Sequence, residues 1–397
     1  MPLIRVGQGP NDAVLHAEID GPTHAPVVAF SNSLGTTAAM WDGLVPFLRG
    51  RYRVLRYDTR GHGRSETSPR PATVQDLAAD LVGLLDALGI GRAHVVGLSL
   101  GGMTAQALGV AAPDRALSLT LMATSAFMPS EASWNERAAL VRREGTAAIA
   151  EATMGRWFTP GFGAREPERA AAIRAQFEAM DREGYALACE AIGRMDLRPD
   201  ISRITAPTLV LAGREDPATP VAMAEEIAGL IEGAELVVLP RAAHLLATER
   251  PDAAASHLLA FLDRHRETGA ASGATAFEAG LGNRRAVLGA AHVDRSLAGA
   301  GAFAQPWQDF ITRTAWGEVW GDPRLPWKTR SLVTLAMMVA LHREEEFKLH
   351  VRPALGNGVS AGELQALLLQ AAIYAGVPAA NAAFRWARDV LGDDLDA

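Results

Sequence analysis

The stretch HVVGLSLGG, from His94 to Gly102, sets a single serine among glycines and apolar residues. Its strand-like start, His94 to Val96, leads into GLSLG, and the helix-compatible run MTAQALGV follows the stretch. Ser99 stands between the two in the pattern G-x-S-x-G, where a tight turn between strand and helix displays the serine hydroxyl. Gly97 and Gly101 are needed because side chains there would collide with neighbouring strand or helix backbone. A plain glycine-rich turn is the alternative, so the rest of the chain must supply partners for a nucleophile.

Around this stretch, strand-like and helix-like segments alternate. The short apolar runs are APVVAFSNS, YRVLRYD, AHVVGLS, TLVLAG and ELVVLP, and amphipathic patterns such as VQDLAADLVGLLDALG lie between them. Such an alternation indicates a mostly parallel sheet covered by helices on both faces. From about residue 125 to 199 the pattern is helical only. An insertion of this kind is expected to form a lid over the carboxyl ends of the strands, where ligands bind in open α/β sheets.

The C-terminal part of the chain has a different composition and hydrophobic pattern. Residues 267–280 are small and polar with scattered glycines, which is typical of a linker. Residues 281–397 contain only helical patterns, and Ser360 followed by Glu363 predicts a capping box at one helix start. We therefore expect an α/β domain over residues 1–266 and an all-α domain over 281–397.

The composition narrows the function classes. The 397 residues carry a net charge of −7, and no Lys/Arg run is concentrated enough to attract nucleic acid or an anionic membrane. The single cysteine, Cys189, excludes an internal disulfide framework and fits a reducing compartment. Neither a signal peptide nor an apolar stretch of membrane-spanning length is recognisable. These features predict a cytoplasmic protein without nucleic-acid or membrane partners.

Two further residues complete a catalytic pattern around Ser99. Asp216 follows one late strand pattern and His244 follows the next, so the chain order is Ser, Asp, His. In such a triad His244 takes the proton of the serine and Asp216 orients the imidazole. The backbone N–H groups of Leu34 and Leu100 are the expected oxyanion hole. This set of residues predicts acyl transfer.

The motifs FSNSLGT, RYDTRGHGRS, GLSLGG, GREDPATP and AAHLLATERP resemble the α/β-hydrolase family, and within it the 3-oxoadipate enol-lactonases. The resemblance covers roughly residues 1–266 and implies a carboxylated lactone as substrate. Such a substrate needs a cation in its pocket, and Arg60 and Arg137, the latter beside Trp134, are the candidates. His62 resembles a structural turn residue of the family.

In the C-terminal part, His342, Glu346 and His350 are spaced four and four, which predicts one face of a single helix. Metal ligands, an acid/base pair of Glu346 and His350, and an ordinary solvated face remain open from this helix alone. No thiol or clustered carboxylate elsewhere in this part supports a metal site.

The stretches WGEVWGDPRLPWKTRSLVTLAMM, EEEFKLHVRPALGNGVS and AAIYAGVPAANAAF resemble the 4-carboxymuconolactone decarboxylase family. That family is all-helical, cofactor-free and related to the AhpD-like peroxidases. The C-x-x-C positions of those peroxidases are Arg343 and Glu346 here, which excludes thiol redox chemistry.

The resemblance implies a set of roles in this part of the chain. His350 is expected to be the acid, with Glu346 tuning its proton, and Arg330 to anchor a carboxylate. Glu318 and Tyr374 are expected as polar members of the pocket. Met337 and Met338 are expected in the core. The resemblance also implies a homo-oligomer built through the C-terminal domain.

Together the two resemblances imply a bifunctional enzyme of protocatechuate degradation, in the β-ketoadipate pathway. It would decarboxylate 4-carboxymuconolactone and hydrolyse the resulting enol-lactone to 3-oxoadipate, without a cofactor or metal. The alternative is a serine-dependent esterase or thioesterase whose C-terminal helices only mediate oligomerisation.

Overall fold

The computed structural model describes residues 3–7, 12–23, 25–68, 70, 72–265, 276–322 and 325–392. The chain divides into two compact units, Met1–Glu267 and Thr268–Ala397, which are described separately. Of the expected linker, residues 267–275 lie outside the described residues, whereas residues 276–280 form the first turn of a helix and not a linker. Among the described residues, no helix combines the length and apolar character needed to cross a bilayer.

The first unit is built on an eight-stranded sheet in the order β1-β2-β4-β3-β5-β6-β7-β8. At one edge β1 pairs antiparallel with β2, and β2 pairs antiparallel with β4. The other six strands, β3 to β8, run parallel to one another. Every residue of the four central strands is buried, which explains their continuous apolar runs. The strands are β1 (Leu3–Val6), β2 (Ala13–Asp20), β3 (Val27–Ser31), β4 (Arg53–Tyr57), β5 (Ala93–Leu98), β6 (Ala116–Met122), β7 (Thr208–Gly213) and β8 (Glu235–Leu239).

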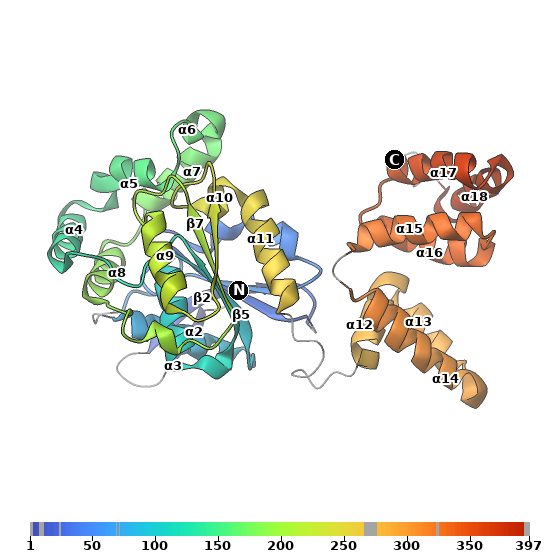
Figure 1. The fold of residues 1–397 in the computed structure, drawn as a ribbon, viewed down its shortest axis with the longest axis horizontal. Coiled ribbons are helices and arrows are strands. Elements are labelled where there is room, and N and C mark those ends of the chain that lie inside the picture. Colours follow the sequence, from blue (N-terminus) through green and yellow to red (C-terminus); the bar gives the residue numbers. More distant parts are fainter. Residues whose placement is uncertain are drawn as a thin grey trace. The chain divides into compact units, whose positions relative to one another are not determined.

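Helices flank both faces of this sheet (Figure 1). α3 packs against β3, β5 and β6 with α2 beside it, and α9 and α11 pack against β7. α2 begins with a capping box in which Thr73 and Asp76 bond each other's backbone N–H groups. The helices of this layer are α1 (Val45–Leu48), α2 (Val74–Ala87), α3 (Leu100–Ala111), α9 (Val221–Leu230), α10 (Leu246–Glu249) and α11 (Pro251–Arg264), with short 3₁₀ turns at Ala38–Trp41, Pro113–Arg115 and Ile201–Arg203.

The insertion between β6 and β7 is helical, as expected for a lid. Trp157, Phe177 and Tyr185 pack edge to face through it, with ring centroids 5.2 and 5.7 Å apart. α4 lies along α8, and Gly193 leaves the space that the Trp134 side chain occupies. The lid helices are α4 (Glu131–Glu144), α5 (Ala150–Trp157), α6 (Phe162–Arg165), α7 (Pro167–Glu178) and α8 (Arg182–Arg194), with a 3₁₀ turn at Thr146–Ile149.

The second unit is all-helical over its described residues, so the expected fold class is confirmed for both units. Phe347 and Trp386 pack at its centre, 5.7 Å apart. Ser360 and Glu363 form the expected capping box. The helices are α12 (Ala276–Leu288), α13 (Ala290–Ala298), α14 (Gly301–Ile311), the π-helix η5 (Thr312–Val319), α15 (Trp327–Ala340), α16 (Glu344–Gly356), α17 (Ala361–Tyr374) and α18 (Val377–Leu391).

Two expectations about this unit are wrong. The single helix expected through His342 breaks between α15 and α16, because His342 adopts a left-handed φ of 53°. α16 restarts with three glutamates in its first turn, where negative charge stabilises a helix N-terminus. Met337, expected in the core, is 59% exposed, whereas Met338 packs partly buried against the core.

Candidate active sites

Ser99 occupies a strained turn between β5 and α3, with φ 56° and ψ −115°. A Cβ on Gly97 would lie 2.0 Å from the Gly101 carbonyl oxygen, and one on Gly101 would lie 2.0 Å from the Ser31 carbonyl oxygen. The backbone of Ser99 donates to Met122 at 2.9 Å and accepts from the Thr124 hydroxyl at 2.7 Å. Close backbone approach therefore requires both glycines, as the sequence predicts, and β6 braces the turn.

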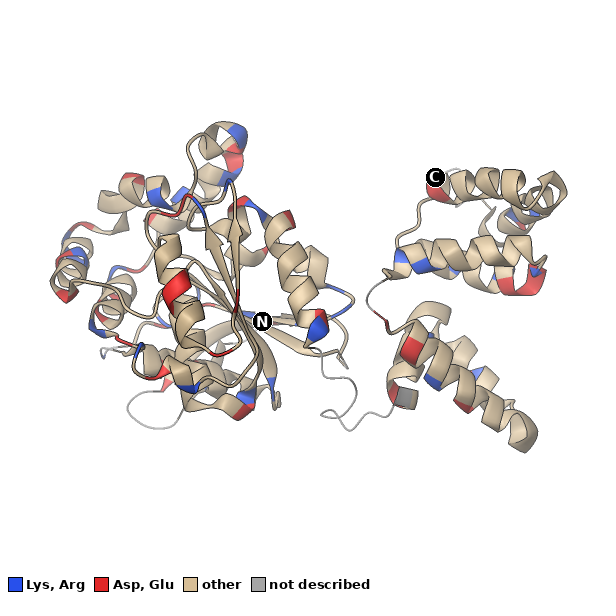
Figure 2. Ribbon diagram, viewed as in Figure 1, with Lys and Arg blue, Asp and Glu red and all other residues tan. Residues whose placement is uncertain are grey.

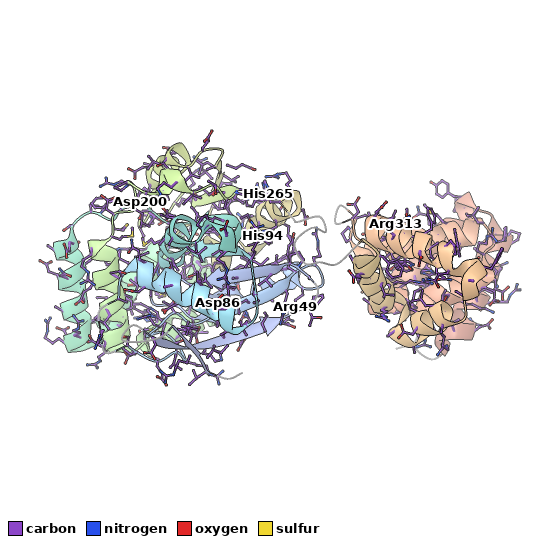
Figure 3. All side chains as sticks on the ribbon, turned by 90° about the horizontal axis from the view of Figure 1, so that it is seen from below. Arg49, Asp86, His94, Asp200, His265 and Arg313 are labelled. Atoms are coloured by element: carbon purple, nitrogen blue, oxygen red, sulfur yellow. The ribbon has the colours of Figure 1, made fainter. Side chains whose placement is uncertain are left out.

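His94, which Figure 3 labels, lies at the start of β5, whereas Ser99 follows its end. Its ring is fully buried and Nδ1 lies 2.8 Å from the Ser118 hydroxyl. This histidine belongs to the packing of the sheet.

Asp216 and His244 extend from the carboxyl ends of β7 and β8, and Oδ2 of Asp216 lies 2.9 Å from Nδ1 of His244. Asp216 also accepts hydrogen bonds from the backbone of Ala218 and from the backbone and hydroxyl of Thr219. Burial opposes ionisation of Asp216, but His244 and Thr219 outweigh it and lower the pKa of Asp216 below its ordinary value. An ionised Asp216 orients the imidazole with Nδ1 toward itself.

A cavity of about 70 Å³ brings these groups together beneath the lid. We call it the triad cavity. Ser99, His244 and Leu34 line it from the sheet side, and Trp134 and Arg137 line it from the lid. Of the sequence-predicted residues of this domain, these five share one cavity.

The loop that carries Leu34 is held by Asn32. Its amide donates to the Tyr57 carbonyl at 2.6 Å, and its carbonyl accepts from the Trp41 indole at 2.7 Å. Leu100 is the first residue of α3, where backbone N–H groups have no acceptor within the helix. Both positions suit the binding of an oxyanion next to Ser99.

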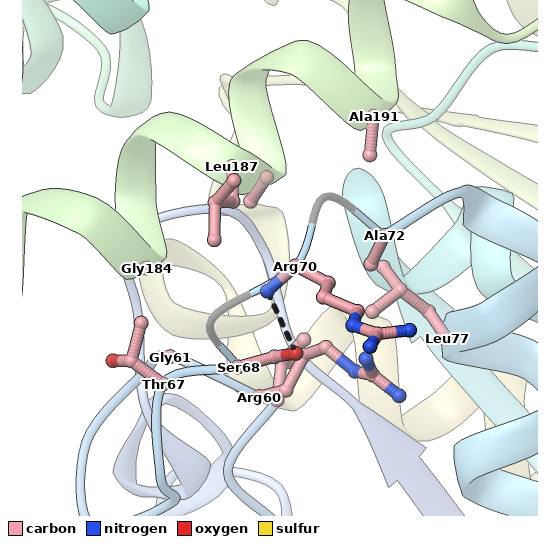
Figure 4. A pocket seen from close by; sticks show the side chains of 12 residues that line it. Arg60, Gly61, Thr67, Ser68, Arg70, Ala72, Leu77, Gly184, Leu187 and Ala191 are labelled. Atoms are coloured by element: carbon pink, nitrogen blue, oxygen red, sulfur yellow. Dashed lines mark hydrogen bonds between the residues drawn. The ribbon is translucent and has the colours of Figure 1, made fainter. Parts of the chain in front are cut away.

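Arg137 and Arg60, the two candidate cations, have different environments. Arg137 donates to the Tyr185 hydroxyl at 2.9 and 2.6 Å and stands 6.0 Å from the Trp134 ring centre, inside the triad cavity. Arg60 instead forms a buried, two-pronged ion pair with Asp80, both bonds at 2.6 Å. It lines a separate small cavity under α8 (Figure 4). The expectation that Arg60 binds substrate beside the triad is wrong, because Asp80 already occupies its guanidinium.

Sequence reasoning missed three residues around the triad cavity. Arg156 lines it from α5, and nothing in the local pattern marks this arginine. Thr219 could have been found as a hydroxyl three residues after Asp216, a typical local bonding distance. Glu249 is buried and accepts from the backbone N–H groups of Thr159, in the lid, and Ala243, before His244. It therefore links the lid to the histidine loop.

In the second unit, His350 on α16 lies against Trp316 on the π-helix η5 and against Trp320, the residue directly after it. The Trp316 and Trp320 rings lie 6.2 and 6.4 Å from the imidazole, the first nearly parallel to it. Burial, with a smaller effect of His292, lowers the pKa of His350 to about 4, against an opposing effect of Glu346. We call these five residues the His350 cluster.

The other residues expected here lie outside this cluster. Arg330 donates to the carbonyls of Asp322 and Leu325, and so holds a loop. Glu318 lies exposed on the π-helix. Tyr374 is 84% exposed at the end of α17. Its expected role as a polar member of a pocket stays a prediction.

The helix break also bears on the interpretation of His342, Glu346 and His350 as possible metal ligands. His342 precedes α16, so the three residues spaced four and four do not share one helix. Within the described part of the chain, no group of three His, Cys, Asp or Glu is arranged to hold a metal ion. His292, Trp316 and Trp320 were missed as neighbours of His350. The spacing of the two tryptophans, one helical turn apart, was the available signal.

Comparison with known proteins matches each unit separately. Residues 26–251 match the alpha/beta hydrolase fold family, and residues 305–389 match the carboxymuconolactone decarboxylase family. Over 242 residues the chain is 38% identical to 3-oxoadipate enol-lactonase 2 of Acinetobacter baylyi, covering 61% of this chain and 90% of that protein.

The second unit matches another protein of the same bacterium. Over 117 residues it is 50% identical to 4-carboxymuconolactone decarboxylase of Acinetobacter baylyi, covering 30% of this chain and 87% of that protein. Among solved structures, the enol-lactonase of Burkholderia xenovorans aligns with 44% identity and a TM-score of 0.62, over 63% of this chain and 96% of that one. The chain therefore belongs to the α/β-hydrolase fold family, and its second unit belongs to the carboxymuconolactone decarboxylase family.

Proposed function

We propose that this chain is a bifunctional enzyme that decarboxylates 4-carboxymuconolactone and hydrolyses the resulting enol-lactone to 3-oxoadipate. The proposal rests on one observation: the two units of this chain resemble two enzymes whose reactions are consecutive. Each unit also contains a cluster of side chains suited to its reaction. The triad cavity supports the hydrolysis, and the His350 cluster supports the decarboxylation. A cytoplasmic location fits the single, buried Cys189.

In the hydrolysis, Ser99 attacks the lactone carbonyl while His244 takes its proton. The backbone N–H groups of Leu34 and Leu100 stabilise the tetrahedral oxyanion. The enol oxygen then leaves the acyl carbon and receives the proton from His244. The resulting enol becomes a ketone by tautomerisation, in which the O–H proton is lost and the neighbouring carbon gains one. Water activated by His244 finally cleaves the acyl-enzyme and regenerates Ser99. Asp216 holds the imidazole throughout.

The substrate carboxylate is bound from the lid in this proposal. Arg137 supplies a planar guanidinium that suits two-pronged pairing with a carboxylate. Tyr185 and Thr153 hold that guanidinium in place. Arg156 adds a second positive charge to the same cavity, and Trp134 covers the planar lactone ring.

In the decarboxylation, the bond between the ring and the carboxylate carbon breaks, and CO₂ leaves. The electron pair passes into the lactone carbonyl as a dienolate, and the ring carbon then takes a proton. In the free protein His350 is neutral at pH 7, because the pKa of its imidazole is about 4. A bound carboxylate favours the protonated imidazole, so substrate binding would supply the acid that the reaction consumes. Glu346 acts in the same direction.

A coupled assay on 4-carboxymuconolactone tests both steps in the full chain. We expect Ser99→Ala to accumulate the enol-lactone and His350→Ala to leave 4-carboxymuconolactone unconsumed. Production of 3-oxoadipate by Ser99→Ala faster than spontaneous hydrolysis would contradict the triad. The esterase or thioesterase alternative, with a merely oligomerising second unit, is not favoured, because that unit matches a decarboxylase.

We also propose that the chain forms a homo-oligomer through its second unit. α15 and α17 are neighbours, and both are free of charged residues over their C-terminal halves (Figure 2). Large apolar side chains stand exposed there: Met337, Leu341, Leu369, Ile373, Tyr374 and Val377. Such a patch is typical of an interface between proteins. Light scattering tests this, with Ile373→Asp expected to lower the mass, and a monomeric wild type contradicting it.

A further inference from the structure

The π-helix Thr312–Val319 positions both tryptophans of the His350 cluster. Its hydrogen bonding continues to Trp320, whose N–H donates to the Ala315 carbonyl at 2.8 Å. Trp316 and Trp320 lie 4.9 Å apart and both face His350. π-helices are rare and costly, and they concentrate at functional sites. Something in this unit must therefore hold the segment away from the α-helical register.

α12 makes three contacts that hold the π-helix. A Cβ on Gly280 would lie 1.9 Å from the Thr312 carbonyl oxygen, so the two backbones touch. The Asn283 amide donates to the Trp316 carbonyl at 2.8 Å. The third contact is made by Arg284, the next residue along the helix.

Arg284 is 4% exposed, and its guanidinium reaches three elements. It donates to the side-chain oxygens of Gln308 at 2.7 Å, Thr312 at 3.1 Å and, more weakly, Ser296 at 3.4 Å. All three acceptors are neutral, and among the described residues no carboxylate pairs with it. Burial lowers the pKa of Arg284. Burying a guanidinium without a counter-ion is costly, so packing alone is a poor reason for this residue.

We propose that Arg284 is a positioning residue of the second active site: it clamps Thr312 and Gln308 and so keeps the π-helix in the register that lays Trp316 and Trp320 against His350. The proposal rests on the decarboxylase function proposed for His350. Its consequence is that Arg284 keeps water from the imidazole without touching the substrate. The charged groups that act on His350 are His292 from α13 and Glu346 from α16 itself.

The test compares Arg284→Gln with Arg285→Gln in the full chain. Arg285 is the neighbouring residue on α12, but it is exposed and pairs with Asp294 at 2.6 Å on the surface. Histidine rings labelled at Cε1 are titrated by NMR, and the His350 signal is assigned by its loss in His350→Gln. We expect Arg284→Gln to raise the pKa of His350 by about one unit or more, because the ring becomes hydrated. Arg285→Gln should leave it unchanged.

Activity gives a second readout. Decarboxylation by Arg284→Gln should fall about tenfold in kcat with little change in KM, since no substrate contact is lost. Its pH profile should move with the pKa of His350, and lactone hydrolysis should stay unchanged. Arg284→Lys, which keeps the charge but loses the fork, should restore only part of the rate.

Three outcomes would overturn the proposal. They are an unchanged pKa of His350 in a folded Arg284→Gln protein, a raised KM of that variant with an unchanged kcat, and equal effects of Arg284→Gln and Arg285→Gln. If Arg284→Gln does not fold, Thr312→Val removes one clamp bond and should raise the pKa of His350 in the same direction. The titration needs no substrate, so a wild type inactive on 4-carboxymuconolactone would refute the proposed function and leave this test standing.

Discussion

The backbone N–H of Leu245 donates to the carbonyl of Trp157 at 2.9 Å. The residue after His244 is thereby bonded to the end of lid helix α5, whose residues line the triad cavity. This hydrogen bond couples the lid to the loop that carries His244.

Glu249 is the side chain that reinforces this coupling. Its carboxylate accepts from Ala243 on the histidine loop and from Thr159 in the lid. Glu249→Gln presents an NH₂ group to donors and leaves one of them unsatisfied, at a cost of about 1–3 kcal/mol. We expect a lower melting temperature and about a tenfold lower kcat/KM for the enol-lactone. Glu225→Gln, on the exposed face of α9, is the control and should match the wild type. Equal behaviour of both variants would exclude the coupling.

Arg137 should determine binding more than turnover. Arg137→Gln removes the carboxylate partner from the triad cavity and should raise KM for the enol-lactone about tenfold or more, because a charge-assisted pair is lost. Steady-state kinetics on the lactone measure this. The control is Arg143→Gln, on the same helix, where the side chain pairs with Glu144 on the surface. An unchanged KM in Arg137→Gln would remove Arg137 from the binding site.

Gly101 should tolerate no side chain. Gly101→Ala places a Cβ 2.0 Å from the Ser31 carbonyl oxygen, between two backbones that cannot separate without opening the sheet. We expect a loss of more than about 4 kcal/mol in the free energy of unfolding, or no folded first unit. Gly155→Ala, within α5 and facing open space, should instead stabilise by up to about 1 kcal/mol. Chemical denaturation measures both, and a well-folded Gly101→Ala protein would contradict the close approach.

His350 should make the second unit sensitive to mild acid. The pKa of His350 is about 4 in the folded protein, against about 6.5 in an unfolded chain. The unfolded state therefore binds the proton more readily between these values. The contribution of His350 to stability is complete above about pH 6.5 and is lost as the pH falls toward 4.

Comparison with His350→Gln isolates this contribution. As the pH falls from 7 to 4.5, the wild type should lose up to about 2–3 kcal/mol relative to the variant. Calorimetry of both proteins at each pH provides the measurement. A constant difference across the window would mean that His350 is not held neutral by its surroundings.

Much of the first site was predictable because its signals are local. The glycines beside Ser99 report close backbone contacts, and Asp216 and His244 each follow a strand whose carboxyl end must meet the others at one edge of a parallel sheet. The break at His342 was not predictable from spacing alone. A spacing of four residues places side chains on one helix face only where the helix is unbroken. The left-handed φ of His342 interrupts the helix here.

Both fold classes and the chain order of the triad can be read from the amino-acid sequence, since hydrophobic period and turn glycines act over a few neighbouring residues. Which charged side chains are available for chemistry depends instead on the three-dimensional fold. Arg60 forms an ion pair with Asp80, whereas Arg137 lines the triad cavity. Arg284 donates to the hydroxyl of Thr312, at the start of a π-helix that no local sequence pattern predicted. Ion pairs and clamps depend on which distant residues the fold brings within bonding distance, and that information is not local.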